Sequence, residues 1–135
     1  MKKLELPLPD DFHVHLRQGV LLENYAKSIA KEFGRILVMP NTVPPITSAA
    51  QIQDYRSQIQ QAAPGLDLLL TFKLNAKFTP EDLKQMKEAG AVAGKYYPAG
   101  VTTNSEDGVS DFDSILPVVA EMEKLGLVLC IHGEE

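Results

Sequence analysis

The chain alternates short apolar runs with segments in which apolar residues recur every three or four positions. A continuous apolar run of about 4–8 residues is typical of a buried strand, whereas the longer spacing is typical of an amphipathic helix. The first predicted strand ends at His13 and His15, and the later strands are predicted at 35–39, 67–72, 91–96 and 127–131. The sequence therefore predicts β-α repeated four times and then a fifth strand, in a parallel sheet covered on both faces.

The four helices are predicted at 22–33, 48–63, 79–89 and 111–125. Gly34 follows the first and suits a left-handed C-terminal cap. Ser48 with Gln51 predicts a capping box for the second helix, and Thr79 followed by proline predicts the start of the third. Pro117 must lie in the first turns of the fourth helix or bend it.

Two architectures fit this pattern, an open doubly wound sheet and a (β/α)8 barrel. An open sheet usually has a glycine-rich phosphate loop after its first strand, and this chain has a His-x-His pair there instead. Polar residues at the carboxyl ends of successive strands are typical of a barrel enzyme. Here they are His13, His15, Asn41, Lys95 and His132. The fold class predicted is α/β, a (β/α)8 TIM barrel of about 250 residues, of which 135 residues supply about the first half.

Composition is that of a soluble globular domain, with 44% hydrophobic and 23% charged residues and no low-complexity linker. We therefore expect residues 1–135 to belong to a single domain. A net charge of −5 without a basic tract argues against nucleic acid as a partner, and no apolar run is long enough for a membrane span. A single Cys130 excludes an internal disulfide and fits a reducing compartment, so a cytoplasmic protein is predicted.

His13 and His15 form the clearest chemical signal. Strand alternation places both imidazoles on one face and Val14 on the other, and two convergent neutral imidazoles suit a divalent metal. An isolated His-x-His pair is more often accidental than metal-binding. Arg17 continues the same row, where it could hold a carboxylate that reaches the metal.

The later polar residues are weaker signals when each is taken alone. Asn41 could be only a turn residue, and His132 could be only a polar residue at a strand end. Lys95 is more unusual, because a lysine in an apolar run must either extend to solvent or be buried at a cost. Carbamylation by CO2 would remove its charge and give a carboxylate able to bridge two metals.

The chain resembles the N-terminal part of dihydroorotase, the zinc amidohydrolase of pyrimidine biosynthesis, and is most similar to the single-function bacterial type. The resemblance covers all 135 residues and rests on the motifs at 11–17, 39–42, 94–105 and 132–134. The first motif is shared across the amidohydrolase superfamily. The third, in which lysine precedes Tyr-Pro-Ala and Thr-Thr-Asn-Ser, is much more specific to dihydroorotase.

The resemblance implies a role for each metal ligand. His13 and His15 would hold the first of two zinc ions, and His132 would bind the second. Lys95, as N6-carboxylysine, would bridge both ions.

The resemblance also implies the substrate and its contacts. The reaction is the reversible cyclisation of N-carbamoyl-L-aspartate to L-dihydroorotate with release of water. Arg17 and Asn41, together with His15, would contact the substrate. Thr102 and Thr103 would lie on a loop that closes over it.

Two residues of the family's site are expected beyond Glu135, namely a proton-carrying aspartate and a further zinc-binding histidine. We therefore expect this chain to be part of a longer polypeptide, or half of an assembly, and to be inactive alone. Five strands and four helices would leave an open edge and an uncovered core face. The resemblance also suggests a homodimer.

Two alternatives from other classes remain open. One is another cyclic amidase of the superfamily, such as a hydantoinase-like enzyme, against which the pair Arg17 and Asn41 argues because it requires an acidic substrate. The other is a non-catalytic dihydroorotase-like partner of a transcarbamoylase. Such a protein would be expected to lose metal ligands. This chain keeps all four of the implied ligands, namely His13, His15, Lys95 and His132.

Overall fold

A parallel sheet of five strands forms the centre of the computed structural model, which describes residues 3–100 and 108–133. The strands are β1 (Asp10–Val14), β2 (Arg35–Val38), β3 (Asp67–Lys73), β4 (Ala91–Tyr96) and β5 (Val128–Ile131). They lie side by side in chain order. A doubly wound sheet would reverse direction at a switch point, whereas a (β/α)8 barrel keeps this order. The predicted half-barrel is therefore confirmed.

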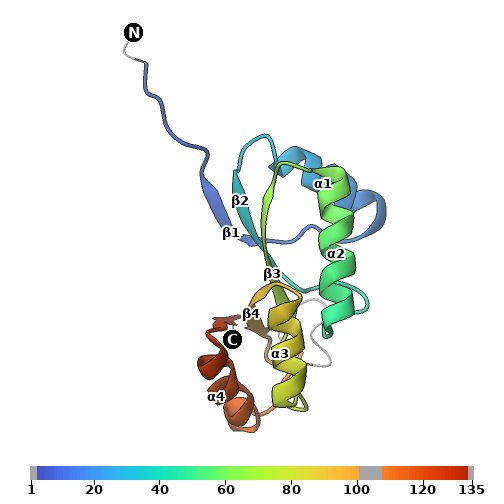
Figure 1. The fold of residues 1–135 in the computed structure, drawn as a ribbon, viewed down its shortest axis with the longest axis vertical. Helices are drawn as coiled ribbons and strands as arrows, with labels where there is room; N and C mark the ends of the chain where they lie inside the picture. Colours follow the sequence, from blue (N-terminus) through green and yellow to red (C-terminus); the bar gives the residue numbers. More distant parts are fainter. Residues whose placement is uncertain (1–2, 101–107, 134–135) are drawn as a thin grey trace.

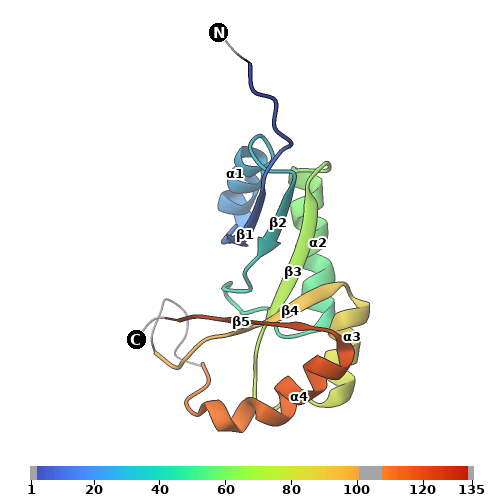
Figure 2. The same ribbon diagram turned by 90° about the vertical axis from the view of Figure 1, so that its left-hand side faces the viewer.

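Four α-helices connect the strands and form a layer in which each contacts the next along the chain (Figure 1). They are α1 (Gly19–Ile29), α2 (Ala49–Ala62), α3 (Pro80–Glu88) and α4 (Leu116–Leu125), the last preceded by a 3-10 turn, η1 (Phe112–Ile115). Figure 2 shows β5 crossing the direction of β1 to β3, so the sheet is strongly twisted. Among the described residues, no helix has the length and apolar character needed to cross a bilayer.

The core lies between the sheet and the helices. Alternate strand residues face the helical layer, as the twofold period of a strand requires. Fully buried members of this core are Ile36, Ile52, Ile59, Leu70, Phe72, Leu83, Met86, Ile115 and Met122. Gly94 in β4 lets the sheet approach α4 closely, because a Cβ there would lie 2.9 Å from Met122 Cε and from the Phe72 ring.

The opposite face of the sheet is not covered by helices. Phe12, Leu37, Leu69, Val128 and Cys130 contribute to an apolar hollow on this face. Phe12 and Val128 remain 54% and 60% exposed. The prediction of a sheet covered on both faces is therefore wrong for the described residues, and the expected uncovered core face is present. The physical reason is that strands of a barrel pack their inner face against other strands instead of helices.

The predicted helix signals are largely confirmed. The Ser48 hydroxyl caps α2 by accepting from Gln51 N, and Pro117 lies in the first turn of α4. Gly34 was wrongly assigned as the left-handed cap of the first helix. That helix ends at Ile29, its C-cap is a right-handed residue, and Gly34 has no positive φ. Gly34 N instead donates to Pro9 O, so this glycine belongs to the start of the sheet.

Candidate active site

The predicted polar residues gather at the carboxyl ends of the strands. His13 lies in β1 and Lys95 lies in β4. His15 directly follows β1, Asn41 lies shortly after β2, and His132 directly follows β5. They also interact electrostatically: desolvation lowers the pKa of His13, and Coulombic interactions with Lys95 and His132 lower it further. The structure therefore brings together residues from strands at opposite ends of the sheet order.

The imidazoles of His13 and His15 converge on one point. His13 Nε2 and His15 Nε2 are 3.3 Å apart, and the ring centroids are separated by 5.2 Å. Two nitrogen ligands of one tetrahedral zinc ion, with Zn–N bonds of about 2.0–2.1 Å, are themselves about 3.3–3.4 Å apart. The pair therefore has the spacing that a shared zinc ion requires. Without a metal, the same spacing allows one ring to donate a hydrogen bond to the other.

Both imidazoles have a lowered pKa, which favours the neutral form that metals bind. Desolvation, followed by the charges of His13, Arg17, Lys95 and His132, lowers the pKa of His15 to about 4. His15 Nδ1 is buried and has no hydrogen-bond partner among the described residues. The described part of the chain contains no cluster of three or more His, Cys, Asp or Glu side chains suited to a metal. Within these residues, a third ligand beside His13 and His15 therefore has to come from another residue type, for which Lys95 is the candidate.

The backbone around β1 departs from a regular strand. The register with β2 shifts between Asp11 and Val14, and the Asp11 carboxylate accepts a 2.9 Å hydrogen bond from His13 N. β1 ends at Val14, and Arg17 has a left-handed φ of 60°. The prediction that strand alternation aligns Arg17 with the two histidines is therefore wrong. A turn places it, yet its charge still lowers the pKa of His15.

Asn41 lies in the loop after β2 and is only 7% exposed, unlike an ordinary turn asparagine. The loop contains a cis peptide bond between Val43 and Pro44. Its conformation is fixed locally, because the Thr42 hydroxyl donates a 2.8 Å hydrogen bond to Pro44 O. Gln18, just before α1, accepts from Val43 N at 2.8 Å and ties this loop to the turn that carries Arg17.

Lys95 is buried, with 2% exposure, so the alternative of a side chain extended to solvent is excluded. Its Nζ donates a 3.1 Å hydrogen bond to Ile131 O and lies 5.6 Å from the centre of the Tyr97 ring. Burial lowers the pKa of Lys95, while the neighbouring Cys130 raises it to a smaller degree. A buried amine of this kind is easier to keep neutral than an exposed one.

His132 follows β5 and is half-buried. Its backbone N donates a 3.1 Å hydrogen bond to Tyr96 O, which continues the pairing of β4 and β5. Its ring lies 5.8 Å from the Tyr97 ring, centre to centre, at an interplanar angle of 37°. His132 thus contacts the same aromatic ring that Lys95 approaches.

Two further residues of the site had no role in the sequence-based prediction, Lys73 and Tyr97. Lys73 is 3% exposed, pairs with Lys95 in the β3–β4 register, and lies 5.9 Å from the Tyr97 ring centre. A lysine at the carboxyl end of a strand could have indicated a site residue. The predicted strand ended at residue 72, however, one residue before Lys73. Thr102 and Thr103 lie outside the described residues.

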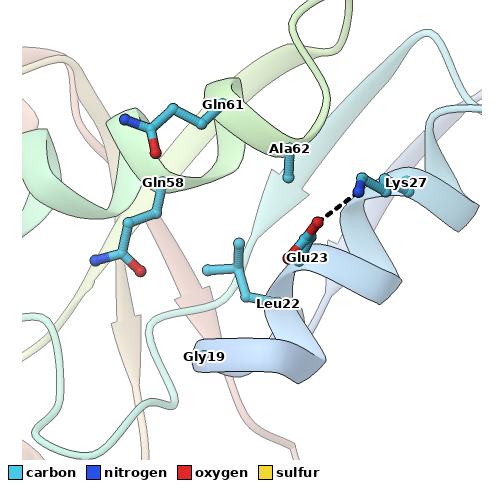
Figure 3. A pocket seen from close by; sticks show the side chains of 7 residues that line it. All are labelled: Gly19, Leu22, Glu23, Lys27, Gln58, Gln61 and Ala62. Carbon is cyan, nitrogen blue, oxygen red and sulfur yellow. Dashed lines mark hydrogen bonds and ion pairs between the residues drawn. The ribbon is translucent and has the colours of Figure 1, made fainter.

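A separate hollow lies between α1 and α2, away from these residues (Figure 3). Gln58 and Gln61 of α2 and Leu22 of α1 contribute to its wall. The charged side chains that line it, Glu23 and Lys27, form an ion pair with each other. This hollow therefore offers no reactive group, and among the described residues the predicted chemical groups lie at the strand ends.

Comparison with known proteins finds similarity to dihydroorotases. No family model matches the chain. A curated dihydroorotase from Allorhizobium ampelinum is 43% identical over 138 aligned residues, covering 99% of this chain and 39% of that protein. The chain spans about two fifths of the length of the curated relatives it matches.

Solved structures agree with this similarity. A Saccharomyces cerevisiae dihydroorotase in complex with 5-fluoroorotic acid matches with a TM-score of 0.88 and 36% identity, over 95% of this chain and 36% of that chain. An Arthrobacter aurescens L-hydantoinase (dihydropyrimidinase) matches with a TM-score of 0.74 and 25% identity, over 93% and 29%. The resemblance indicated by the sequence motifs is thereby confirmed.

Proposed function

We propose that the protein is a zinc-dependent dihydroorotase, because the chain is similar to dihydroorotases over nearly its whole length. It interconverts N-carbamoyl-L-aspartate and L-dihydroorotate, with release of water on ring closure, in de novo pyrimidine biosynthesis. The observation that carries this proposal is the 3.3 Å separation of His13 Nε2 and His15 Nε2. A buried lysine and a third histidine lie at the same edge of the sheet.

The metal ligands of the proposed site are His13, His15, Lys95 and His132. When bound, two zinc ions supply Lewis-acid polarisation of the amide carbonyl and activation of water. Lys95 acts as N6-carboxylysine: its neutral amine forms an N–C bond with CO2 and loses a proton to solvent. Burial disfavours the lysine ammonium, which supports this modification. The resulting carboxylate would help to hold the zinc ions.

Substrate binding is assigned to the groups around the metal ligands. Arg17 is the cation proposed to hold the carboxylate of the substrate, together with the buried Asn41 and with His15. Thr102 and Thr103 are proposed to donate hydroxyl hydrogen bonds from a closing loop. The proton-carrying aspartate of the family is assigned to no residue of this chain.

The alternatives are less well supported. The hydantoinase match has a lower identity and TM-score than the dihydroorotase match, and a hydantoin does not need the carboxylate-binding Arg17. A non-catalytic partner would have no reason to keep His13 and His15 at the spacing of zinc ligands. We also propose a cytoplasmic homodimer that acts on a small molecule and has no nucleic-acid or membrane partner. The negative net charge and lack of a basic tract support the absence of nucleic acid.

The test combines the intact mass of the purified protein, its zinc content and its hydrolysis of L-dihydroorotate. We expect about two zinc ions per chain, and turnover that a chelator abolishes and that zinc with bicarbonate restores. A full-length protein that folds and binds zinc but does not hydrolyse L-dihydroorotate would overturn the proposal. Turnover at a mass of 14.8 kDa would show instead that the proton carrier lies within these residues. Faster hydrolysis of an unsubstituted hydantoin would favour the hydantoinase-like alternative.

A further inference from the structure

Tyr97 contains a buried hydroxyl group that the proposed mechanism does not use. The residue directly follows β4 and is 3% exposed. Its hydroxyl oxygen is buried and makes no hydrogen bond among the described residues. Buried polar groups in folded proteins nearly always have a partner, and an unpartnered donor is unfavourable. The phenol therefore needs an acceptor that the described part of the chain does not supply.

The ring of Tyr97 lies among the proposed metal ligands. Its centre is 5.6 Å from Lys95 Nζ and 5.8 Å from the centre of the His132 ring. Lys73 Nζ lies 5.9 Å from the same centre. The backbone is held in place because Tyr97 O accepts a 3.0 Å hydrogen bond from Val109 N. The position of the phenol is therefore set by the sheet and by the segment that follows it.

Arg17 acts on the same phenol. Burial raises the pKa of Tyr97 to about 12, and the positive charge of Arg17 opposes this rise. The guanidinium group of Arg17 therefore lies within electrostatic reach of the phenol, whose hydroxyl can donate one hydrogen bond. An anionic oxygen near both groups would accept a hydrogen bond from each, and such charge-assisted bonds are the stronger kind.

Tyr96 provides a natural contrast. It is half-buried, and its ring packs edge-to-face on Phe112 of η1 at a centroid distance of 5.4 Å and an angle of 89°. Tyr96 thus packs on η1, whereas the ring of Tyr97 lies beside Lys95 and His132. Only the second tyrosine is therefore associated with the proposed site.

We propose that Tyr97 is a further substrate-binding residue, whose hydroxyl donates a hydrogen bond to the substrate carboxylate that Arg17 binds. This inference rests on the proposed function and deepens it. The Tyr97 hydroxyl would add a neutral, directional hydrogen-bond donor beside the Arg17 cation. The carboxylate would then be recognised by its orientation as well as by its charge. Binding would also satisfy the hydroxyl that is buried without a partner.

The test compares Tyr97→Phe with the matched control Tyr96→Phe in the full-length, zinc-loaded protein. Both variants remove one hydroxyl and keep the ring. We expect Tyr97→Phe to weaken orotate binding, measured by calorimetry, by about 10-fold or more. KM for L-dihydroorotate should rise with it, while zinc content and kcat change little. Tyr96→Phe should leave all four values unchanged. Unchanged orotate affinity and KM in Tyr97→Phe would overturn the inference.

A double-mutant cycle tests whether the two groups share one carboxylate. If they do, Tyr97→Phe should weaken orotate binding less in an Arg17→Gln background than in the parent, and full additivity would contradict a shared acceptor. Should Tyr97→Phe fail to fold, tyrosine labelled with 13C at Cζ gives a second readout. The Tyr97 resonance should shift when orotate binds, and an unshifted resonance would reject the contact. A parent protein that neither binds zinc nor turns over substrate would instead reject the proposed function.

Discussion

The hydroxyl group of Tyr55 in α2 donates a 2.7 Å hydrogen bond to the backbone carbonyl of Arg17. Arg17 has a φ of 60°, a left-handed conformation that is uncommon for a residue with a side chain. Tyr55 is buried, and desolvation raises the pKa of its phenol, so the donor stays protonated. The helix layer thus holds the turn that presents the proposed substrate-binding cation.

Tyr55→Phe removes this hydrogen bond without removing the ring. We expect the free energy of unfolding to fall by about 0.5–1.5 kcal/mol. We also expect a several-fold rise in KM for L-dihydroorotate, with zinc content unchanged, because Arg17 is less well positioned. Denaturant unfolding and steady-state kinetics measure the two effects. Tyr25→Phe, at an exposed tyrosine of α1, is the control. An unaltered KM would show that the turn holds Arg17 without Tyr55.

Zinc binding gives a second prediction. His13→Asn removes one of the two convergent nitrogens, so we expect the zinc content to fall by about one ion per chain and activity to be lost. Elemental analysis after dialysis against a weak chelator measures this. Asn24→Ala, on the exposed surface of α1, should keep the full zinc content. Retention of two tightly bound ions by His13→Asn would remove His13 from the ligand set.

The order of elements could be predicted from the sequence because each depends on local patterns. Apolar runs located four of the five strands, and cap residues such as Ser48 and Thr79 located helix starts. The prediction of a left-handed cap at Gly34 was wrong because glycine tolerates many backbone conformations. The conformation of Gly34 depends instead on the hydrogen bond from its N to Pro9 O. Contacts between distant segments leave no periodic signal in the sequence.

The same limit explains what could be predicted of the site. His13, His15, Lys95 and His132 were predicted because metal-binding residue types stand out at strand ends, and the structure brings them to one edge. The metal-binding roles themselves stay predictions. Lys73 and Tyr97 were missed because their position depends on strand register and burial, and a lysine or tyrosine alone is an ordinary residue.

The cap of α3 gives a third prediction. The Thr79 hydroxyl accepts from Asp82 N at 3.2 Å, and the Asp82 carboxylate accepts from Thr79 N at 2.9 Å. Thr79→Ala should lower the free energy of unfolding by about 1 kcal/mol near neutral pH, and Thr79→Ser should lower it less. Denaturant unfolding measures both. An equal loss in the two variants would show that the methyl group, not the hydroxyl, matters.

The pH dependence of this cap has a defined sign. Hydrogen bonds from the Thr79 side chain, and then from its backbone, lower the pKa of Asp82 below its usual value of 3.8. A lowered folded-state pKa stabilises the protein above the unfolded-state pKa, and this contribution is lost as the pH falls through the folded-state pKa. The stability difference between Thr79→Ala and the parent should therefore shrink below about pH 4. A difference that is constant down to pH 2 would exclude the carboxylate as a partner.

The last prediction concerns Gly94, the residue before Lys95. A methyl group there would lie 2.9 Å from Met122 Cε and from the Phe72 ring, closer than packed carbon atoms allow. Gly94→Ala should therefore lower the free energy of unfolding by about 1–3 kcal/mol. Because β4 would have to move away from α4, carrying Lys95 with it, zinc affinity should fall as well. Gly65→Ala is the matched control, since nothing lies within 4 Å of a Cβ at that position, and it should be neutral or slightly stabilising. If Gly94→Ala unfolds more easily but binds zinc as tightly as the parent, the packing of β4 on α4 supports the fold without positioning Lys95.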